Sequence, residues 1–232
     1  ELVSQQQIDL KQFYPQTGWV EQDPEEIWKN TLECCRQALK KIALSAQQIA
    51  AIGISNQRET TLIWDRKSGE PIYPAIVWQD RRTSQLCSAL AEQKIFSCVT
   101  EKTGLLLDPY FSATKIVWLL ENIPQARERA VRGELAFGTV DTFLLWRLTH
   151  GETHATDATN ASRNLLFNIQ TQMWDEELLR AFDIPASHLP EVWDNSADCG
   201  ETKTDLFGAN IPITGKSGQQ QADLDVQTSC SR

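Results

Sequence analysis

The stretch GISNQRETT, residues 53–61, decides the expected fold of this chain. One apolar run, Ile49–Ile54, leads into it, and another, Leu62–Trp64, follows it. Short apolar runs bounded by polar clusters are typical of buried strands. The sequence therefore predicts strands over residues 49–55 and 60–65, with a tight polar connection between them.

Arg58 and Glu59 stand side by side in that connection. Adjacent residues on a regular strand point to opposite faces, so an irregular backbone is needed for both to face one site. A carboxylate accepts hydrogen bonds from hydroxyl groups and a guanidinium donates several, which together suit a small polyol. The alternative that spacing alone favours is an exposed ion pair in a loop, which contributes little to stability.

Charge and cysteine content narrow the class of protein. The 22 Lys and Arg against 31 Asp and Glu give a net charge of −9, which argues against nucleic acid or an anionic membrane as a partner. The six cysteines have no zinc-ligand spacing, so reduced thiols in a cytoplasmic protein are expected. The sequence shows no signal peptide and no apolar run of the roughly 20 residues that a membrane span needs. The chain begins at Glu1 and ends in polar residues, and we expect it to be cut at both ends.

Strand and helix patterns alternate along the chain, which predicts an α/β domain with a mixed sheet flanked by helices. The clearest helix start is Asp23–Glu26, with a capping acid, a proline at the first helical position and two acids at the positive end of the helix dipole. Helices are predicted over residues 24–43, 84–90, 112–122, 126–131, 141–148 and 175–182, and a short helix or turn near residue 95, over 95–99. Further strands are predicted over 75–78, 135–138, 165–169 and 211–214, and an edge strand or extended arm over 1–13.

Six segments, in order along the chain, resemble segments of the glycerol kinases, which belong to the FGGY family of carbohydrate kinases. They are GWVEQDP (18–24), NQRETT (56–61), AIVWQDRR (75–82), DPYFS (108–112), GTVDT (138–142) and TDATNASR (156–163). Residues 110–122, with Lys115 and Trp118 at fixed positions, also resemble the signature of the wider FGGY family. This resemblance implies the ribonuclease-H-like (actin-like ATPase) fold, in which two such domains close on a cleft.

The resemblance implies ATP- and Mg²⁺-dependent phosphorylation of glycerol to glycerol 3-phosphate. It assigns Arg58, Glu59, Tyr110 and Gln220 to the polyol hydroxyls and packs Trp78 on the carbon face. Residues 1–222 would form the N-terminal, polyol-binding domain, and residues 223–232 a divergent tail. Glycerol and ATP are then the expected partners, and a homo-oligomer is left open.

Three departures from the family pattern bear on catalysis and regulation. The family's GDQQA string reads GQQQA over residues 218–222, so Gln219 stands at the position of the catalytic aspartate and no catalytic residue is intact. The family's phosphate-binding hairpin would precede residue 1, and its adenosine-binding domain would follow residue 232. Asn210 replaces an arginine of the regulatory sugar-bisphosphate site. ATP and Mg²⁺ are therefore expected to bind poorly to this chain alone, and no metal site is expected.

Three interpretations are left open. The chain supplies the polyol-binding part of a glycerol kinase and is inactive alone; it is a non-catalytic polyol- or partner-binding module of the same fold; or it belongs to an FGGY kinase for another sugar. The NQRETT and DPYF strings favour glycerol. Whether the chain is an enzyme by itself is left open, because Gln219 replaces the carboxylate.

Three other motifs point less clearly to a site. Arg81 and Arg82 could serve phosphate, although a solvated helix start is favoured. His150 and His154 are four residues apart, but Gly151 lies between them, so they do not share a helix face and a metal pair is not expected. The GKS string over residues 215–217 lacks the upstream glycine spacing of a phosphate-binding loop.

Overall fold

The two strands predicted around residues 53–61 are both present and pair with different partners. β2 (Ile52–Asn56) is parallel to β10 (Ile213–Gly218), and β3 (Leu62–Asp65) is antiparallel to β5 (Leu135–Gly138). The computed structural model describes residues 2–93 and 98–222. Parallel and antiparallel pairs occur together, so the predicted mixed α/β arrangement is confirmed.

Three shorter strand pairs extend this arrangement. They are β1 (Glu21–Gln22) antiparallel to β4 (Ala75–Ile76), β6 (Ala155–Asp157) parallel to β9 (Glu191–Trp193), and β7 (Phe167–Asn168) antiparallel to β8 (Met173–Trp174). A bridge between Thr61 and Ile76 connects β4 to the segment that enters β3. β10 is longer than predicted, because the glycine- and lysine-containing segment 215–218 continues the strand.

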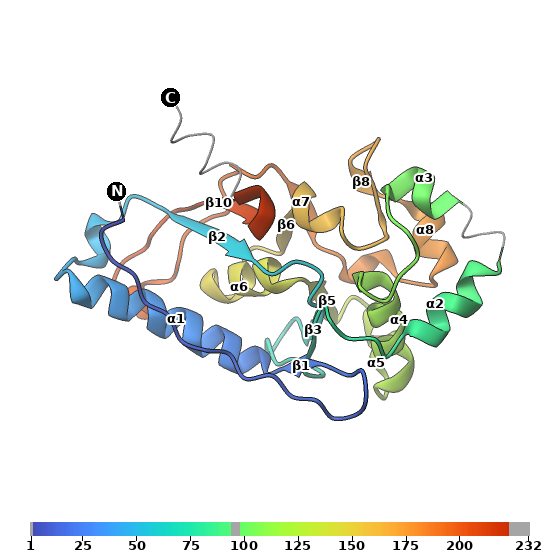
Figure 1. Ribbon diagram of the computed structural model, residues 1–232. Helices are drawn as coiled ribbons and strands as arrows, with labels where there is room; N and C mark the ends of the chain where they lie inside the picture. The colour runs from blue at the N-terminus through green and yellow to red at the C-terminus, as the bar shows by residue number, and fades with distance from the viewer. Residues whose placement is uncertain (1, 94–97, 223–232) are drawn as a thin grey trace.

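Helices cover the strands at both ends of the molecule (Figure 1). The described helices are α1 (Pro24–Lys41), α2 (Ser84–Ala91), α3 (Val99–Thr103), α4 (Ser112–Asn122), α5 (Ala126–Val131), α6 (Val140–Leu148), α7 (Ala158–Ala161), α8 (Glu176–Ala181) and α9 (Thr204–Phe207), with 3₁₀ turns η1 (Ala46–Gln48) and η3 (Ala186–His188). α1 lies along one end beside β2, and α2, α4, α5 and α8 gather at the other. The helix predicted near residue 95 and the tail 223–232 lie mostly or wholly outside the described residues.

Helix α1 forms as its first turn predicts. The Asp23 side chain accepts a hydrogen bond from the Glu25 N–H at 2.8 Å, which satisfies one of the free donors of the first turn. The N-terminal arm runs back along this helix: Ser4 Oγ donates to the Ala38 carbonyl at 2.7 Å, and Lys41 Nζ donates to the Gln5 carbonyl at 2.8 Å. Side chains therefore hold the first part of the arm, and an antiparallel bridge between Phe13 and Glu21 pairs its end with β1.

The core consists of two groups of buried apolar side chains. One surrounds α4 and α5, and the other surrounds Trp64, Phe143 and the buried face of α1. α6 lies within the second group and is buried on nearly every side, as expected for a helix that is apolar all round. Its N-cap is Thr139, whose hydroxyl donates to the Asp141 carboxylate.

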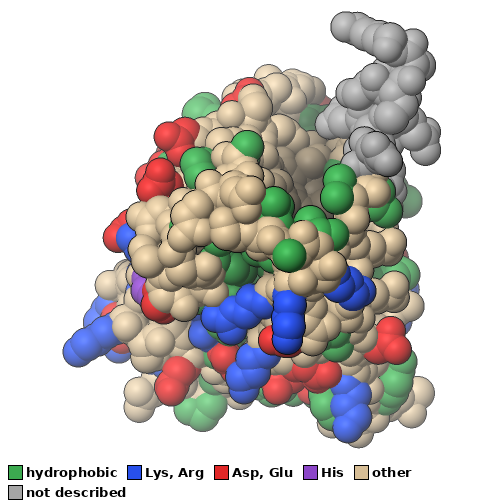
Figure 2. Space-filling view, turned by 90° about the vertical axis from the view of Figure 1, so that its left-hand side faces the viewer, with side chains coloured by type: hydrophobic (Ala, Val, Ile, Leu, Met, Phe, Trp, Pro, Cys, Tyr) green, Lys and Arg blue, Asp and Glu red, His purple; other side chains and the backbone are tan. Residues whose placement is uncertain are grey.

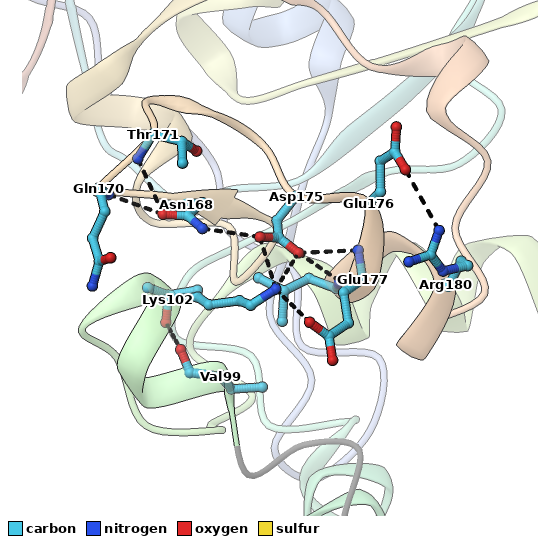
Figure 3. Close-up of polar contacts among 11 residues, drawn as sticks. Val99, Lys102, Asn168, Gln170, Thr171, Asp175, Glu176, Glu177 and Arg180 are labelled. Atoms are coloured by element: carbon cyan, nitrogen blue, oxygen red, sulfur yellow. Dashed lines mark hydrogen bonds and ion pairs between the residues drawn. The ribbon is translucent and has the colours of Figure 1, made fainter.

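A cluster of charged side chains, at the end of the molecule away from the last turns of α1, joins α3 to α8 (Figure 3). Lys102 Nζ donates to both Asp175 oxygens, at 2.9 and 3.0 Å, and to Glu177 at 2.6 Å. Asp175 also caps α8 and accepts from Asn168 Nδ2 at 3.0 Å. These hydrogen bonds, first with Glu177 and then with Asp175, raise the pKa of Lys102. The lysine therefore stays charged and joins elements that are distant in sequence.

Charges of both signs are mixed on the end of the molecule that carries the last turns of α1. Figure 2 shows Lys and Arg side chains interspersed with Asp and Glu over the lower half of this face. A groove of about 510 Å³ at α1 is lined by Glu33, Arg36, Gln37, Lys40 and Lys41. No helix among residues 2–93 and 98–222 is both long enough and apolar enough to cross a membrane.

Acidification is expected to destabilise the fold through His188. This imidazole is fully buried beside Phe137, with ring centroids 6.2 Å apart, and burial lowers its pKa from 6.5 to about 3. Between these two values the unfolded chain binds a proton that the native state excludes. The free energy of unfolding therefore falls as the pH falls, by roughly 1.4 kcal/mol per pH unit for this one proton.

A His188→Phe variant isolates this contribution, because it removes the titrating ring but keeps an aromatic side chain of similar shape. Urea unfolding at pH 7.0, 5.5 and 4.5 should give a shallower loss of stability on acidification than in the unmodified chain. His154, whose pKa burial lowers to about 4, is present in both proteins and adds to the loss of stability of each on acidification. Parallel pH profiles would contradict the assignment to His188.

Candidate functional site

Glu59 lies at the sharp turn between β2 and β3. Its φ of 64° is in the left-handed region, which is unfavourable for a residue with a side chain. Two groups from the first turn of α4 hold its carbonyl oxygen, because Ser112 Oγ and Lys115 Nζ both donate to it at 3.3 Å. The irregular backbone that the sequence requires at this point is therefore present.

Arg163 links Glu59 to the aromatic part of the candidate site. The Glu59 side chain is only 3% exposed, and its Oε1 accepts a hydrogen bond from Arg163 Nε at 2.7 Å. The Arg163 Cζ lies 5.8 Å from the ring centroid of Tyr110 and 4.8 Å from that of Phe111. One guanidinium thus contacts a carboxylate from the β2–β3 turn and two rings that precede α4.

Trp78 extends this row of contacts. Its ring centroid lies 5.6 Å from that of Tyr110, with the planes tilted by 57°. Trp78 follows β4, so four separate segments of the chain each contribute one residue to this row: Trp78, Tyr110, Arg163 and Glu59. The row has apolar ring faces at one end and a buried carboxylate at the other.

Arg58 points toward the end of β10 instead. Parallel strands place their carboxyl ends at the same edge, and Asn56 of β2 lies opposite Gly218 of β10. Arg58 Nη1 donates to Gln221 Oε1 at 3.0 Å, and Arg58 Nε is buried without a hydrogen-bond partner among residues 2–93 and 98–222. A Cβ at Gly218 would lie 2.3 Å from Arg58 Cδ, so glycine is needed where the arginine crosses the strand.

Gln219 and Gln220 follow at the same edge. Residues 219–222 are helical, and the Gln219 and Gln220 side chains are exposed. The residue at the expected catalytic position therefore follows directly on the strand that runs parallel to β2. A groove of about 430 Å³ runs beside these two strands, lined by residues 53–55, 195–196, 214–217 and 222.

A network of buried polar side chains holds the carboxyl ends of β2 and β10 in place. Asn56 Nδ2 donates to Asp141 Oδ1 at 3.3 Å and to Asn160 Oδ1 at 3.0 Å, and Asn160 Nδ2 donates to Asp157 Oδ1 at 2.6 Å. Asp157 caps α7, whose Thr159 hydroxyl accepts from the Gly218 N–H at 2.8 Å. Burial, followed by the charge of Asp157, raises the pKa of Asp141 to about 6. The network joins β2, β10, α6 and α7.

Asp108 shapes the turn that presents Tyr110. Its Oδ1 accepts from the Tyr110 N–H at 2.8 Å and from Arg81 Nη1 at 3.0 Å. Lys115 Nζ donates to the Tyr110 carbonyl at 2.7 Å. Arg81 is half-exposed and serves this turn, which agrees with its expected position at a solvated helix start.

Arg82 corrects an expectation, because it is not solvated. Its side chain is fully buried, and Nη2 donates to Glu21 and to Asp80 at 2.8 Å each. Its Cζ lies 3.8 Å from the Trp19 ring centroid and 4.6 Å from that of Trp118. Two carboxylates and two ring faces replace the water that the guanidinium loses on burial. This cluster anchors the segment that carries Trp78.

The structure thus brings Glu59, Tyr110 and Trp78 together through Arg163, and it places Arg58 and Gln221 at the neighbouring strand edge. Sequence reasoning did not single out Arg163 or the bonding role of Lys115. Their only signal was membership of two motifs, TDATNASR and the segment after DPYF. A separate apolar groove of about 660 Å³, lined by Phe13, Pro15, Glu21, Asp23, Pro24, Glu25, Pro71, Ile72, Tyr73 and Pro74, lies on another part of the surface.

The residues present do not fit a complete Mg²⁺–nucleotide site. Within residues 2–93 and 98–222, no group of three His, Cys, Asp or Glu side chains converges. Mg²⁺ at kinase sites is held by one or two carboxylates together with substrate phosphates. The exposed side chain at the strand edge, Gln219, is neutral, so we derive no reaction step through a metal.

Comparison with known proteins gives one consistent result. The model of the FGGY family of carbohydrate kinases, N-terminal domain, matches residues 1–224. The chain is 60% identical to the glycerol kinase of Ectopseudomonas mendocina over 222 residues and 61% identical to that of Methylobacterium nodulans over 226 residues. These matches cover 96% and 97% of this chain but 45% of each relative.

Solved structures agree with this match. The crystal structure of Plasmodium falciparum glycerol kinase with ADP superposes with a TM-score of 0.86 at 38% identity, covering 92% of this chain and 43% of that one. A gluconate kinase from Lactobacillus acidophilus has a TM-score of 0.79 at 21% identity, covering 90% and 42%, and shows the shared fold alone. The chain therefore spans less than half the length of these relatives.

Proposed function

Because the chain belongs to the FGGY family of carbohydrate kinases, we propose that it supplies the polyol-binding part of a glycerol kinase. The observation that carries the proposal is the row Trp78–Tyr110–Arg163–Glu59, which joins apolar ring faces to a buried carboxylate. Glycerol has the matching chemistry, since three hydroxyl groups stand on a short carbon chain. Transfer of a phosphoryl group from ATP is proposed only for this part combined with a nucleotide-binding part.

Each residue has a role that follows from its chemistry. Glu59 accepts hydrogen bonds from glycerol hydroxyls, and Arg163 orients its carboxylate. Arg58 donates through its unpaired Nε, and the exposed Gln220 offers an amide at the same edge. The rings of Tyr110 and Trp78 pack on the carbon chain. These contacts hold the alcohol and exclude water from one side of it.

Phosphoryl transfer needs a carboxylate that orients the alcohol and accepts its proton, and ATP with Mg²⁺ supplies the phosphoryl group and the charge that stabilises its transfer. A glutamine amide at position 219 accepts a hydrogen bond but takes no proton. The chain can therefore position glycerol without activating it. A cytoplasmic setting is part of the proposal, and the reduced thiols of Cys34, Cys35, Cys87 and Cys199 favour it.

Gln219 also favours a second candidate, a non-catalytic polyol-binding module of the same fold. Both candidates predict glycerol binding at the same residues. They differ in whether the site completes a kinase when the nucleotide-binding part and an aspartate are supplied. Identity of 60% to glycerol kinases argues against a longer sugar as the ligand in either case.

The isolated chain is expected to bind glycerol with a dissociation constant in the millimolar range or weaker. A closed cleft excludes water and strengthens polar contacts, and this chain provides one side of such a cleft. Titration followed by NMR, with the Trp indole N–H signals as the readout, measures the affinity. The expected affinity is low, since a dissociation constant of ~1 mM corresponds to a binding free energy of only about −4 kcal/mol. Micromolar binding would show that a second domain is not needed. No binding at about 1 M glycerol would contradict the proposed function.

A further inference from the structure

We infer that Lys115 is a positioning residue of the polyol site: its ammonium group holds the Glu59 and Tyr110 segments at a fixed separation. The inference rests on the proposed function, because it concerns the same site. Lys115 does not lie in the row of side chains offered to the ligand. It acts from behind, through the backbone of two residues in that row.

The contacts of Lys115 define this arrangement. Nζ donates to the Tyr110 carbonyl at 2.7 Å and to the Glu59 carbonyl at 3.3 Å. Glu59 belongs to the β2–β3 turn and Tyr110 to the segment before α4, so no local structure sets their distance. Ser112, one turn earlier on α4, donates to the Glu59 carbonyl only. Among these donors, Lys115 alone bonds both segments.

Burying the Lys115 ammonium group costs free energy, which argues that its hydrogen bonds to the Glu59 and Tyr110 carbonyls serve a function. The side chain is 0% exposed, and an ammonium group buried without a carboxylate in hydrogen-bond contact loses hydration that neutral carbonyls only partly replace. Burial lowers the pKa of Lys115 to about 7. The negative charges of Asp80, Glu59 and, more weakly, Asp108 act to raise this pKa, and the positive charge of Arg82 lowers it further. An apolar side chain would fill the same space without that cost.

The hydrogen bond from Lys115 to the Glu59 carbonyl also helps to hold Glu59 in its unfavourable backbone conformation. A residue at φ 64° keeps that conformation only where its surroundings hold it. Loss of Lys115 Nζ removes this donor from the Tyr110 carbonyl, and it leaves the Glu59 carbonyl with two of its three side-chain donors, those of Thr61 and Ser112. The Glu59 carboxylate and the Tyr110 ring can then move relative to each other. In catalysis a misplacement of about 1 Å can cost about 10²-fold in rate, and we expect a displacement here to weaken glycerol binding.

The test compares glycerol binding by the full 232-residue chain and by three variants. Lys115→Met keeps the length and removes all donors, and it should weaken glycerol binding by about 10-fold or more, as expected for a lost hydrogen bond to a charged group. Lys115→Gln, whose amide is too short to reach both carbonyls, should weaken binding about fivefold or more. NMR titration with glycerol gives each dissociation constant, and thermal unfolding gives each melting temperature.

Lys216→Met is the matched control. Lys216 is also buried, at 2% exposed, but its Nζ contacts Cys199 Sγ at 3.2 Å and the Trp193 ring at 5.2 Å. A purely structural role of Lys115 would make the Lys115 and Lys216 variants alike in both measurements. A positioning role changes the glycerol affinity in the Lys115 variants only.

The outcomes separate this inference from the proposed function. The inference is overturned if a folded Lys115→Met or Lys115→Gln variant binds glycerol with a dissociation constant within about twofold of that of the unmodified chain. A twofold change is smaller than the effect expected from a lost hydrogen bond. The proposed function is unaffected by that result. If Lys115→Met does not fold, Lys115→Gln decides. If the unmodified chain shows no glycerol binding, the proposed function fails and the inference fails with it.

Discussion

A Gln219→Asp substitution is expected to raise kinase turnover by about 10²–10⁴-fold, the usual contribution of a general base, once the chain is completed. The completed protein is a chimera that joins this chain to the parts of the Ectopseudomonas mendocina glycerol kinase that it does not match. The physical reason is that a carboxylate at the end of β10 can orient the alcohol and take its proton, whereas an amide cannot. ATP-dependent formation of glycerol 3-phosphate is the measurement.

Two controls make this result interpretable. Gln170→Asp places the same charge on an exposed loop residue beyond β7 and should leave turnover unchanged. The chain without the added parts should be inactive with either residue at position 219, because positioning and charge stabilisation supply most of phosphoryl-transfer catalysis. Equal rates for the glutamine and aspartate chimeras would refute the role assigned to position 219. Turnover by the uncompleted chain would refute the assignment of this chain to one part of the enzyme.

A Glu59→Gln substitution is expected to weaken glycerol binding by about 10- to 150-fold, which corresponds to the 1.5–3 kcal/mol of a hydrogen bond to a charged group. The amide keeps the shape of the side chain but removes the negative charge that accepts from hydroxyls and pairs with Arg163 at 2.7 Å. NMR titration of the chain with glycerol measures the loss. In the chimera, the same variant should raise KM for glycerol while KM for ATP changes little.

Glu25→Gln is the matched control for loss of a partly buried Glu–Arg pair. Glu25 lies in the first turn of α1 and pairs with Arg147, away from the row of Trp78, Tyr110, Arg163 and Glu59. Its loss should lower the melting temperature without changing glycerol affinity. Glycerol binding by Glu59→Gln that equals that of Glu25→Gln would remove Glu59 from the site.

Local patterns predicted the elements that depend on local physics. The capping acid and proline before α1 set where this helix begins, and the strands around residues 53–61 follow from apolar runs between polar clusters. α4 and α5 lie over the predicted residues. The α1 prediction ended two residues too late, and the β10 prediction stopped short, because a strand rich in glycine and serine has a weak pattern.

Long-range contacts set the limit of what the sequence predicted. Arg82 was expected at a solvated helix start, but Glu21, Asp80 and two tryptophan rings surround it in the fold. Arg163 contacts Glu59 across 104 positions of sequence, and no periodicity or spacing encodes such a pair. The candidate residues themselves came from resemblance to a family, whereas the guanidinium and ammonium groups that connect them required tertiary structure.

Intermolecular nuclear Overhauser effects between ¹³C-labelled glycerol and the full chain test the central claim most directly. The account predicts contacts from glycerol to the aromatic protons of Trp78 and Tyr110, lost together in the Glu59→Gln variant. Contacts to Phe13 and Tyr73 instead, which line the separate groove of about 660 Å³, would contradict the account. So would contacts to Trp78 and Tyr110 that remain at full strength when Glu59 is replaced.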